Sequence, residues 1–195
     1  MYDLPVTVTV GGTEYAIRNK ADYRTILDAL VVCNDPELTQ QERMISALII
    51  FYEGIDDVDT LFNTFLGHEE EAASAMGRFM SCNEEDELGY KTNIKLIDWQ
   101  QDEKLIVSAI NNVARTEIRA LPYLHWWTFM SYYLAIGECA LSTVVGIRDK
   151  IARGRKLEKY EQEFRRDNPQ YFRWKNQELE AKALLDSIWT HEKKE

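Results

Sequence analysis

Residues 121–147, LPYLHWWTFMSYYLAIGECALSTVVGI, restrict the fold of this 195-residue chain more than any other stretch. They contain one acid, Glu138, and one imidazole, His125. A helix that is apolar nearly all round lies either in the centre of a bundle or in a membrane. Pro122 suits the first turn of such a helix. The sequence therefore predicts a long helix over these residues, and its environment has to be inferred from the rest of the chain.

The same run is long enough to span a bilayer. A positive flank of the kind found beside spanning helices follows it, formed by Arg148, Lys150, Arg153 and Arg155. However, Glu138 would lie in mid-span, where an acid is costly. Amphipathic helices elsewhere also need a surface to cover. We therefore expect a buried central helix, and the alternative is a membrane-associated protein with a spanning helix over residues 121–147.

The N-terminus has the pattern of a β-hairpin. Val6-Thr7-Val8-Thr9-Val10 alternates apolar and polar residues, Gly11-Gly12 follows, and a second short polar-apolar stretch runs to Arg18. Glycines supply the positive φ that a tight turn needs. We expect a hairpin over about residues 5–18. Because an isolated hairpin is marginal in water, it should pack on helices.

From about residue 20 the apolar residues recur with a helical period. Thr39 and Glu42 have capping-box spacing at the start of one helix, and Asp57 or Asp59 caps a short helix that Gly67 ends. The polar residues 83–93 are the best loop candidate. The fold class predicted is mostly α, a helical bundle with a short N-terminal β-hairpin.

An Asp167-Asn168-Pro169 break suggests a boundary near the C-terminus. We expect one helical domain over residues 1–168 and an amphipathic helix over 169–195, which is a candidate appendage. The net charge is −12 over residues 1–150 and +2 over residues 151–195. A body this acidic repels phosphates, so we expect no nucleic-acid partner. Three widely spaced cysteines form no CxxC pair, which fits a reducing, cytoplasmic location.

No residue pattern predicts catalysis. His68 precedes Glu69-Glu70-Glu71, but consecutive residues on a helix point in different directions, so we interpret them as a solvated acidic face. Cys139 lacks a nucleophile motif with His125 or His68. We expect no enzyme activity, no metal and no cofactor. The role of Glu138 stays open. This residue either pairs with a Lys or Arg at a helix junction or acts as a functional acid.

Large aromatic side chains are the candidates for binding a partner. His125, Trp126 and Trp127 are adjacent in the apolar run, and on a helix the two Trp are about 100° apart, so at least one faces the core. Tyr171, Phe172 and Trp174 follow the Asn168-Pro169 break. Such residues are common both in cores and at binding hot spots. These six residues are the predicted partner-binding set.

Several short motifs resemble those of the bacteriophage gene product fifteen family, from tailed phages and prophages of Gram-positive hosts. The residues that carry the resemblance are Asp22-Tyr23-Arg24, Tyr52-Glu53-Gly54, Asp98-Trp99 with Gln101-Asp102 and Leu105-Ile106, Leu124-His125-Trp126-Trp127 with Phe129, and Ile147-Arg148 with Lys150. The resemblance covers most of the chain and weakens after about Pro169.

The resemblance implies a role in tail morphogenesis, because genes of this family lie among tail genes near the tape-measure gene. It implies a tail assembly chaperone that holds the tape-measure protein while tail-tube subunits assemble, stays in the host cytoplasm and leaves before the virion is finished. An aromatic-lined helical surface is suited to covering an apolar helical stripe. A homo-oligomer is compatible with this role. The resemblance transfers no catalytic residue.

Overall fold

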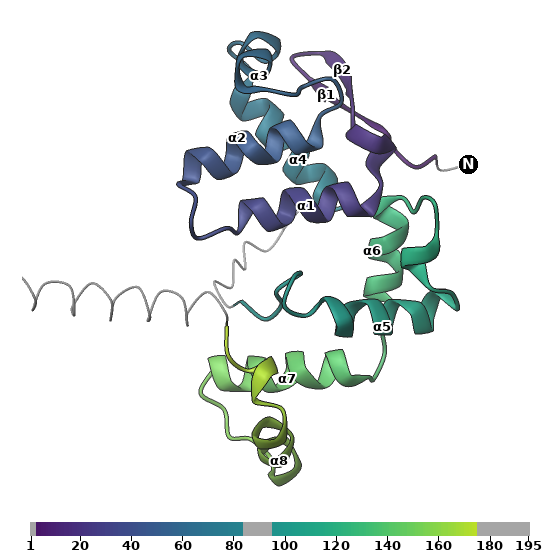
Figure 1. Ribbon diagram of the computed structural model, residues 1–195, viewed down its shortest axis with the longest axis vertical. Coiled ribbons are helices and arrows are strands. Elements are labelled where there is room, and N and C mark those ends of the chain that lie inside the picture. The colour runs from purple at the N-terminus through teal and green to yellow at the C-terminus, as the bar shows by residue number, and fades with distance from the viewer. Residues whose placement is uncertain (1–2, 84–94, 175–195) are drawn as a thin grey trace, which may run out of the picture. The chain divides into compact units, whose positions relative to one another are not determined.

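The computed structural model describes residues 3–83 and 95–174. Contacts within the chain divide it into two compact units. Within the described residues, unit 1 comprises 3–83 and 107–136, and unit 2 comprises 95–106 and 137–174. Helices dominate both units, which confirms the mostly α prediction (Figure 1).

Unit 1 begins with the predicted hairpin. Strands β1 (Thr7–Val10) and β2 (Thr13–Ala16) pair antiparallel, with Val8 opposite Tyr15. Gly11 and Gly12 form the two-residue turn between them with φ of 56° and 76°, a backbone conformation that glycine adopts without steric cost. The hairpin prediction is confirmed.

Helices α1 (Tyr23–Cys33) and α2 (Gln40–Phe51) lie side by side in unit 1 (Figure 1). The capping box at the start of α2 is present, since the Thr39 hydroxyl accepts from the Glu42 N–H and the Glu42 carboxylate accepts from the Thr39 N–H. Asp57, not Asp59, caps the short helix α3 (Val58–Thr64) through the Thr60 N–H. Local capping signals in the sequence therefore mark these helix starts correctly.

Helix α4 (Glu69–Met80) packs beside β1, and helix α6 (Trp126–Leu134) packs on α1. A 3-10 turn, η2 (Ile118–Ala120), precedes α6. The largest fully buried side chains of unit 1 are mostly aromatic or aliphatic: Ile17, Ile26, Phe51, Tyr52, Leu61, Phe65, Ile110, Ile118, His125, Trp126 and Phe129. The core of unit 1 is thus built from residues spread over more than a hundred positions of the sequence.

Unit 2 contains the start of α5 (Glu103–Ala114), helix α7 (Ala140–Ala152), helix α8 (Lys159–Asp167) and the 3-10 turn η3 (Pro169–Tyr171). Gly154, with φ of 65°, lies between α7 and α8. Lys150 on α7 pairs with Glu161 on α8 at 2.7 Å. Residues 169–174 belong to the same compact unit as α7.

The prediction of one long helix over residues 121–147 is wrong. The run forms α6 and the first part of α7, with a break between them. Cys139 is extended (φ −163°, ψ 179°), and its N–H donates to the Ser142 hydroxyl at 2.8 Å. The Ser142 hydroxyl accepts the Cys139 N–H in place of a helical carbonyl. This bond therefore caps the start of α7.

Two further expectations about that run are corrected. Within residues 3–83 and 95–174 no helix is both long and apolar enough to cross a membrane, which argues against the spanning alternative. Glu138 is exposed in the break between α6 and α7, so it is not the buried acid that we considered.

The proposed boundary at residue 168 stays a prediction. Most of the predicted loop 83–93 and of the predicted C-terminal helix lie outside the described residues, as do Leu184 and Trp189. What the structure describes of the 169–195 segment is η3 and the three residues after it.

Candidate functional site

His125 is 2% exposed and joins the start of α6 to the N-terminal segment. Its Nδ1 accepts the Trp127 N–H at 3.0 Å, so Nε2 carries the proton and donates to the Pro5 carbonyl at 2.8 Å. Burial lowers the pKa of the imidazole, and the Pro5 bond opposes this shift. We call this arrangement of His125, Pro5 and Trp127 the His125 junction. It requires a neutral ring.

The two tryptophans bind the end of α4. The Trp126 indole N–H donates to the Met80 carbonyl at 2.9 Å, and the Trp127 indole N–H donates to the Phe79 carbonyl at 3.0 Å. Carbonyls in the last turn of a helix lack partners from a following turn. The Met80 carbonyl takes its bond from Trp126, and the Phe79 carbonyl accepts from Trp127 in addition to the Cys82 N–H. Trp126 is 1% exposed and leaves a partner no surface to contact, whereas Trp127 is half-buried.

Two of the C-terminal aromatic residues, Tyr171 and Trp174, contact Arg148 in unit 2. The buried Arg148 guanidinium donates to the Tyr171 carbonyl at 2.6 Å and to the Leu96 carbonyl at 2.9 Å. It also binds both carboxylate oxygens of the buried Asp102, at 2.6 and 2.9 Å. The Trp174 ring lies over the guanidinium, with 4.3 Å between Arg148 Cζ and the ring centroid. We call this arrangement the Arg148 junction.

Half-buried Tyr171, Phe172 and Trp174 thus contribute to the packing of unit 2, where Phe172 meets Phe164 edge-on with 6.3 Å between ring centroids. The predicted set is divided between the units: His125, Trp126 and Trp127 lie together in unit 1, and the other three lie together in unit 2. A partner-binding role for the half-exposed members stays a prediction.

Other motif residues also hold the fold. The Asp22 carboxylate caps α1 through the Arg24 N–H and accepts the Leu124 N–H at 3.0 Å. The Arg24 guanidinium binds Asp22 and the Leu121 carbonyl. The buried Tyr52 hydroxyl donates to the Ala72 carbonyl at 2.9 Å. These short motifs therefore explain the architecture, and a functional surface has to be sought around them.

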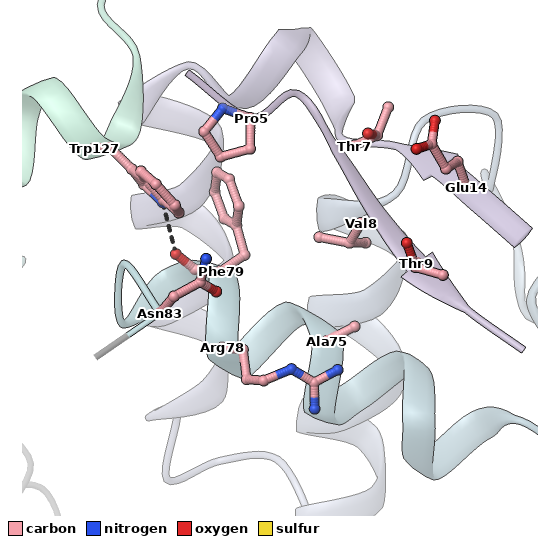
Figure 2. A pocket seen from close by; sticks show the side chains of 10 residues that line it. All are labelled: Pro5, Thr7, Val8, Thr9, Glu14, Ala75, Arg78, Phe79, Asn83 and Trp127. Carbon is pink, nitrogen blue, oxygen red and sulfur yellow. Dashed lines mark hydrogen bonds between the residues drawn. The ribbon is translucent and has the colours of Figure 1, made fainter. Parts of the chain in front are cut away.

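A groove of about 360 Å³ lies between β1 and α4 in unit 1 (Figure 2). Strand residues form one wall, and Ala75, Arg78 and Phe79 of α4 form the other. Trp127 closes one end, where its indole N–H reaches the Phe79 carbonyl (Figure 2). The full lining is Pro5, Thr7, Val8, Thr9, Glu14, Ala75, Arg78, Phe79, Asn83 and Trp127. We refer to it as the β1–α4 groove.

The β1–α4 groove is suited to binding and carries two charged side chains, Glu14 and Arg78, which come from different walls. Trp127 is the one member of the predicted partner-binding set that lines it. Sequence reasoning missed Arg78 and the groove itself, because no local pattern shows that β1 lies against α4. The alternation of Val and Thr was the available signal for an exposed strand.

A second pocket, of about 550 Å³, lies beside three successive residues with positive φ: Asn19, Lys20 and Ala21. Backbone strain of this kind is often found at functional sites. Two of the charged groups here are already used, since Asp22 and Arg24 bind each other, and the Tyr123 hydroxyl donates to the Lys20 backbone carbonyl. This pocket is therefore a weaker candidate than the β1–α4 groove.

An exposed apolar surface lies on α3 and the turn that follows it. Val58 and Phe62 of α3 and Leu66 of the turn are 44%, 39% and 78% exposed. Leu61 and Phe65 are buried instead. We call the exposed three residues the α3 face. Exposed acids lie on both sides of it in the sequence: Asp56, Asp57, Asp59, Glu70 and Glu71.

Sequence reasoning missed the α3 face, because it did not separate Phe62 from the buried Leu61 and Phe65 of this helix. The missed signal was a second apolar series four residues apart, Val58-Phe62-Leu66, beside the buried series Leu61-Phe65. A short helix that has apolar residues on two sides buries only one of them. The other side is exposed.

Among the residues that the structure describes, no group of three or more His, Cys, Asp or Glu side chains is arranged to hold a metal ion. His68 is exposed and contacts Glu71 at 3.1 Å, at the start of α4. His125 and Cys139 are used in caps at the starts of two different helices.

Comparison with known proteins gives one match. The family model described as Bacteriophage Gp15 protein matches residues 1–172 of the chain. Searches of curated proteins and of solved structures found no match. The matched range includes every motif residue discussed above and ends inside the C-terminal aromatic group.

Proposed function

The chain belongs to the Bacteriophage Gp15 protein family, and from that premise we propose that it is a tail-assembly chaperone. It binds the tape-measure protein of the same phage in the host cytoplasm while tail-tube subunits assemble, and it is absent from the finished virion. In this proposal the protein acts by binding and is not an enzyme.

The α3 face is the observation that carries the proposal. A tape-measure protein presents long apolar helical stripes, and such stripes bind to exposed apolar surfaces on helical partners. Val58, Phe62 and Leu66 offer an apolar surface of this kind. The acids beside it favour a partner helix with Lys or Arg next to its apolar stripe, because complementary charge sets orientation.

Co-expression with the tape-measure protein tests the proposal. We expect the intact chain to raise the amount of tape-measure protein in the soluble fraction and to purify with it. The double variant Phe62→Ser/Leu66→Ser should lose most of this effect, since truncating a central apolar contact costs about 2 kcal/mol or more. Leu134→Ser is the matched control, because Leu134 is 64% exposed on α6.

Two outcomes would contradict the proposal. One is a tape-measure protein whose solubility and recovery do not depend on this chain. The other is equal binding by the α3 double variant and the Leu134→Ser control. A homo-oligomer formed through the same face is the competing use of these residues. Sedimentation of the purified chain alone, with and without the double substitution, tells self-association apart from binding to the tape-measure protein.

A further inference from the structure

Strand β1 has one edge that β2 does not cover. The two-stranded sheet pairs Val8 with Tyr15 and Val10 with Thr13, and the Ile17 N–H continues the ladder to the Val6 carbonyl at 2.9 Å. In antiparallel pairs the bonded residues alternate along each strand. The even-numbered residues of β1 therefore point their backbone groups at β2, and the odd-numbered residues point theirs away from it.

Side chains already bind the two ends of this outer edge. At one end the Pro5 carbonyl accepts from His125 Nε2 at 2.8 Å. At the other end the Gly11 N–H donates to the Glu71 carboxylate, and this bond is the main cause of the lowered pKa of Glu71. Both partners come from elements that face β1 across the groove. The outer edge of β1 is thus directed toward α4 and α6.

Thr7 and Thr9 lie between those ends. Their outward N–H and C=O groups have no hydrogen-bond partner among residues 3–83 and 95–174, and both residues line the β1–α4 groove. Unpaired backbone groups on an edge strand are a template for another strand. At a rise of about 3.3 Å per residue, a peptide of three extended residues is long enough to pair with both threonines.

The other wall of the groove indicates which side chains such a peptide carries. Arg78 is exposed and has no ion-pair partner in the described part of the chain. Trp127 presents a half-buried aromatic ring at the same end, and this ring lies beside the buried Phe79 ring with 5.8 Å between centroids. An acidic side chain of the peptide complements the Arg78 charge, and an apolar side chain complements the Trp127 ring.

We propose that the β1–α4 groove binds an extended peptide segment of a partner protein, which adds to the outer edge of β1 as a third strand. Its backbone pairs with Thr7 and Thr9, an acidic side chain meets Arg78, and an apolar side chain packs on the half-buried Trp127 ring. The groove shares no residue with the α3 face, so this inference and the chaperone proposal are tested independently.

Peptide selection followed by amide exchange tests the inference. The probe is a displayed library of random linear 12-residue peptides, panned on the full chain, and the selected sequences are then synthesised and labelled. We expect peptides that contain Asp or Glu near an apolar residue. In NMR exchange, the Thr7 and Thr9 amides should exchange fast in the free protein and slowly in the complex. The Val8 and Val10 amides, which pair with β2, should exchange slowly in both.

Substitutions separate backbone pairing from side-chain contact. Thr9→Pro removes one outward N–H and leaves the ladder to β2 intact, so affinity should fall about tenfold, whereas Thr9→Val should bind like the wild type. Arg78→Glu should weaken binding by about tenfold or more, because it reverses the charge that meets the peptide acid. Arg115→Glu is the matched control, since Arg115 is also exposed in unit 1 and does not line the groove.

The inference is overturned if no selected peptide binds more tightly than about 1 mM. It is also overturned if peptides bind without slowing exchange at Thr7 and Thr9. Should Thr9→Pro fail to fold, the exchange measurement and the Arg78→Glu comparison still decide the outcome. Loss of peptide binding in Arg78→Glu with an unchanged tape-measure interaction would show that the two surfaces serve different partners.

Discussion

The His125 junction of unit 1 and the Arg148 junction of unit 2 perform the same structural task by different chemistry. His125 donates to one backbone carbonyl far away in the sequence, that of Pro5, and Arg148 donates to two, those of Leu96 and Tyr171. His125 does so as a neutral ring with one acceptor and one donor nitrogen. Arg148 does so as a cation that also binds the buried Asp102. The first junction therefore depends on pH, and the second depends on keeping both members of the charge pair.

Removing one member of the buried pair has the largest expected effect. Asp102→Ala leaves the Arg148 guanidinium buried without its anion, which costs about 3–5 kcal/mol. We expect residues 137–174 to lose protection in hydrogen exchange while residues 3–83 keep theirs. The double variant Asp102→Leu/Arg148→Met is the control and should recover much of the loss, because it removes both charges. An unaltered Asp102→Ala protein would contradict the role given to this pair.

The two tryptophans beside His125 should differ in their contribution to stability. Trp126→Ala empties a fully buried position stacked on Phe129, with 5.5 Å between ring centroids, and should cost about 3–5 kcal/mol in urea unfolding. Trp127→Ala should cost less, because Trp127 is half-buried and borders the groove. The reverse order would mean that the core of unit 1 is centred elsewhere.

A change of pH should separate the two junctions. Burial depresses the pKa of His125 in the folded state, so the unfolded chain takes up the proton first as the pH falls. The stability that the neutral ring contributes is complete above its unfolded pKa of about 6.5 and is lost as the pH falls toward the folded pKa.

The measurement is the difference in unfolding free energy between pH 7 and pH 5. We expect a smaller loss in His125→Asn than in the wild type. Equal pH dependence in the wild type and His125→Asn would show that His125 does not titrate between the folded and unfolded states as described.

The smallest effect on stability is expected on the α3 face. Leu66→Ser should change the unfolding free energy by no more than about 0.5 kcal/mol, because the side chain is 78% exposed. Thermal and urea unfolding measure this, and the same variant is then used in binding. A large loss of stability would mean that Leu66 packs within the protein and is not a free surface.

Local sequence signals predicted local structure well. The Gly11-Gly12 turn, the capping box of Thr39 and Glu42 and the cap before α3 depend on neighbouring residues. The single helix over 121–147 failed because composition alone does not show where a helix is interrupted. The hydrogen bond from the Cys139 N–H to the Ser142 hydroxyl caps the start of α7. It depends on a single hydroxyl within an apolar run.

The candidate sites were less accessible to sequence reasoning. The Asp102–Arg148 pair joins residues 46 positions apart, and the bond from His125 to Pro5 spans 120. No spacing rule predicts such contacts. Asp102 lies just before α5, and the structure buries its carboxylate against the Arg148 cation. The Arg78 side of the groove likewise depends on how α4 packs beside β1.

Hydrogen exchange on the complex with the tape-measure protein tests most directly whether the motif residues hold the fold while the α3 face binds. We predict new protection over residues 58–66 when the tape-measure protein is added. Protection around residues 125–127 and 145–150 should be the same in the free and bound protein. Protection that appears at the two junctions, with none over residues 58–66, would contradict this division of roles.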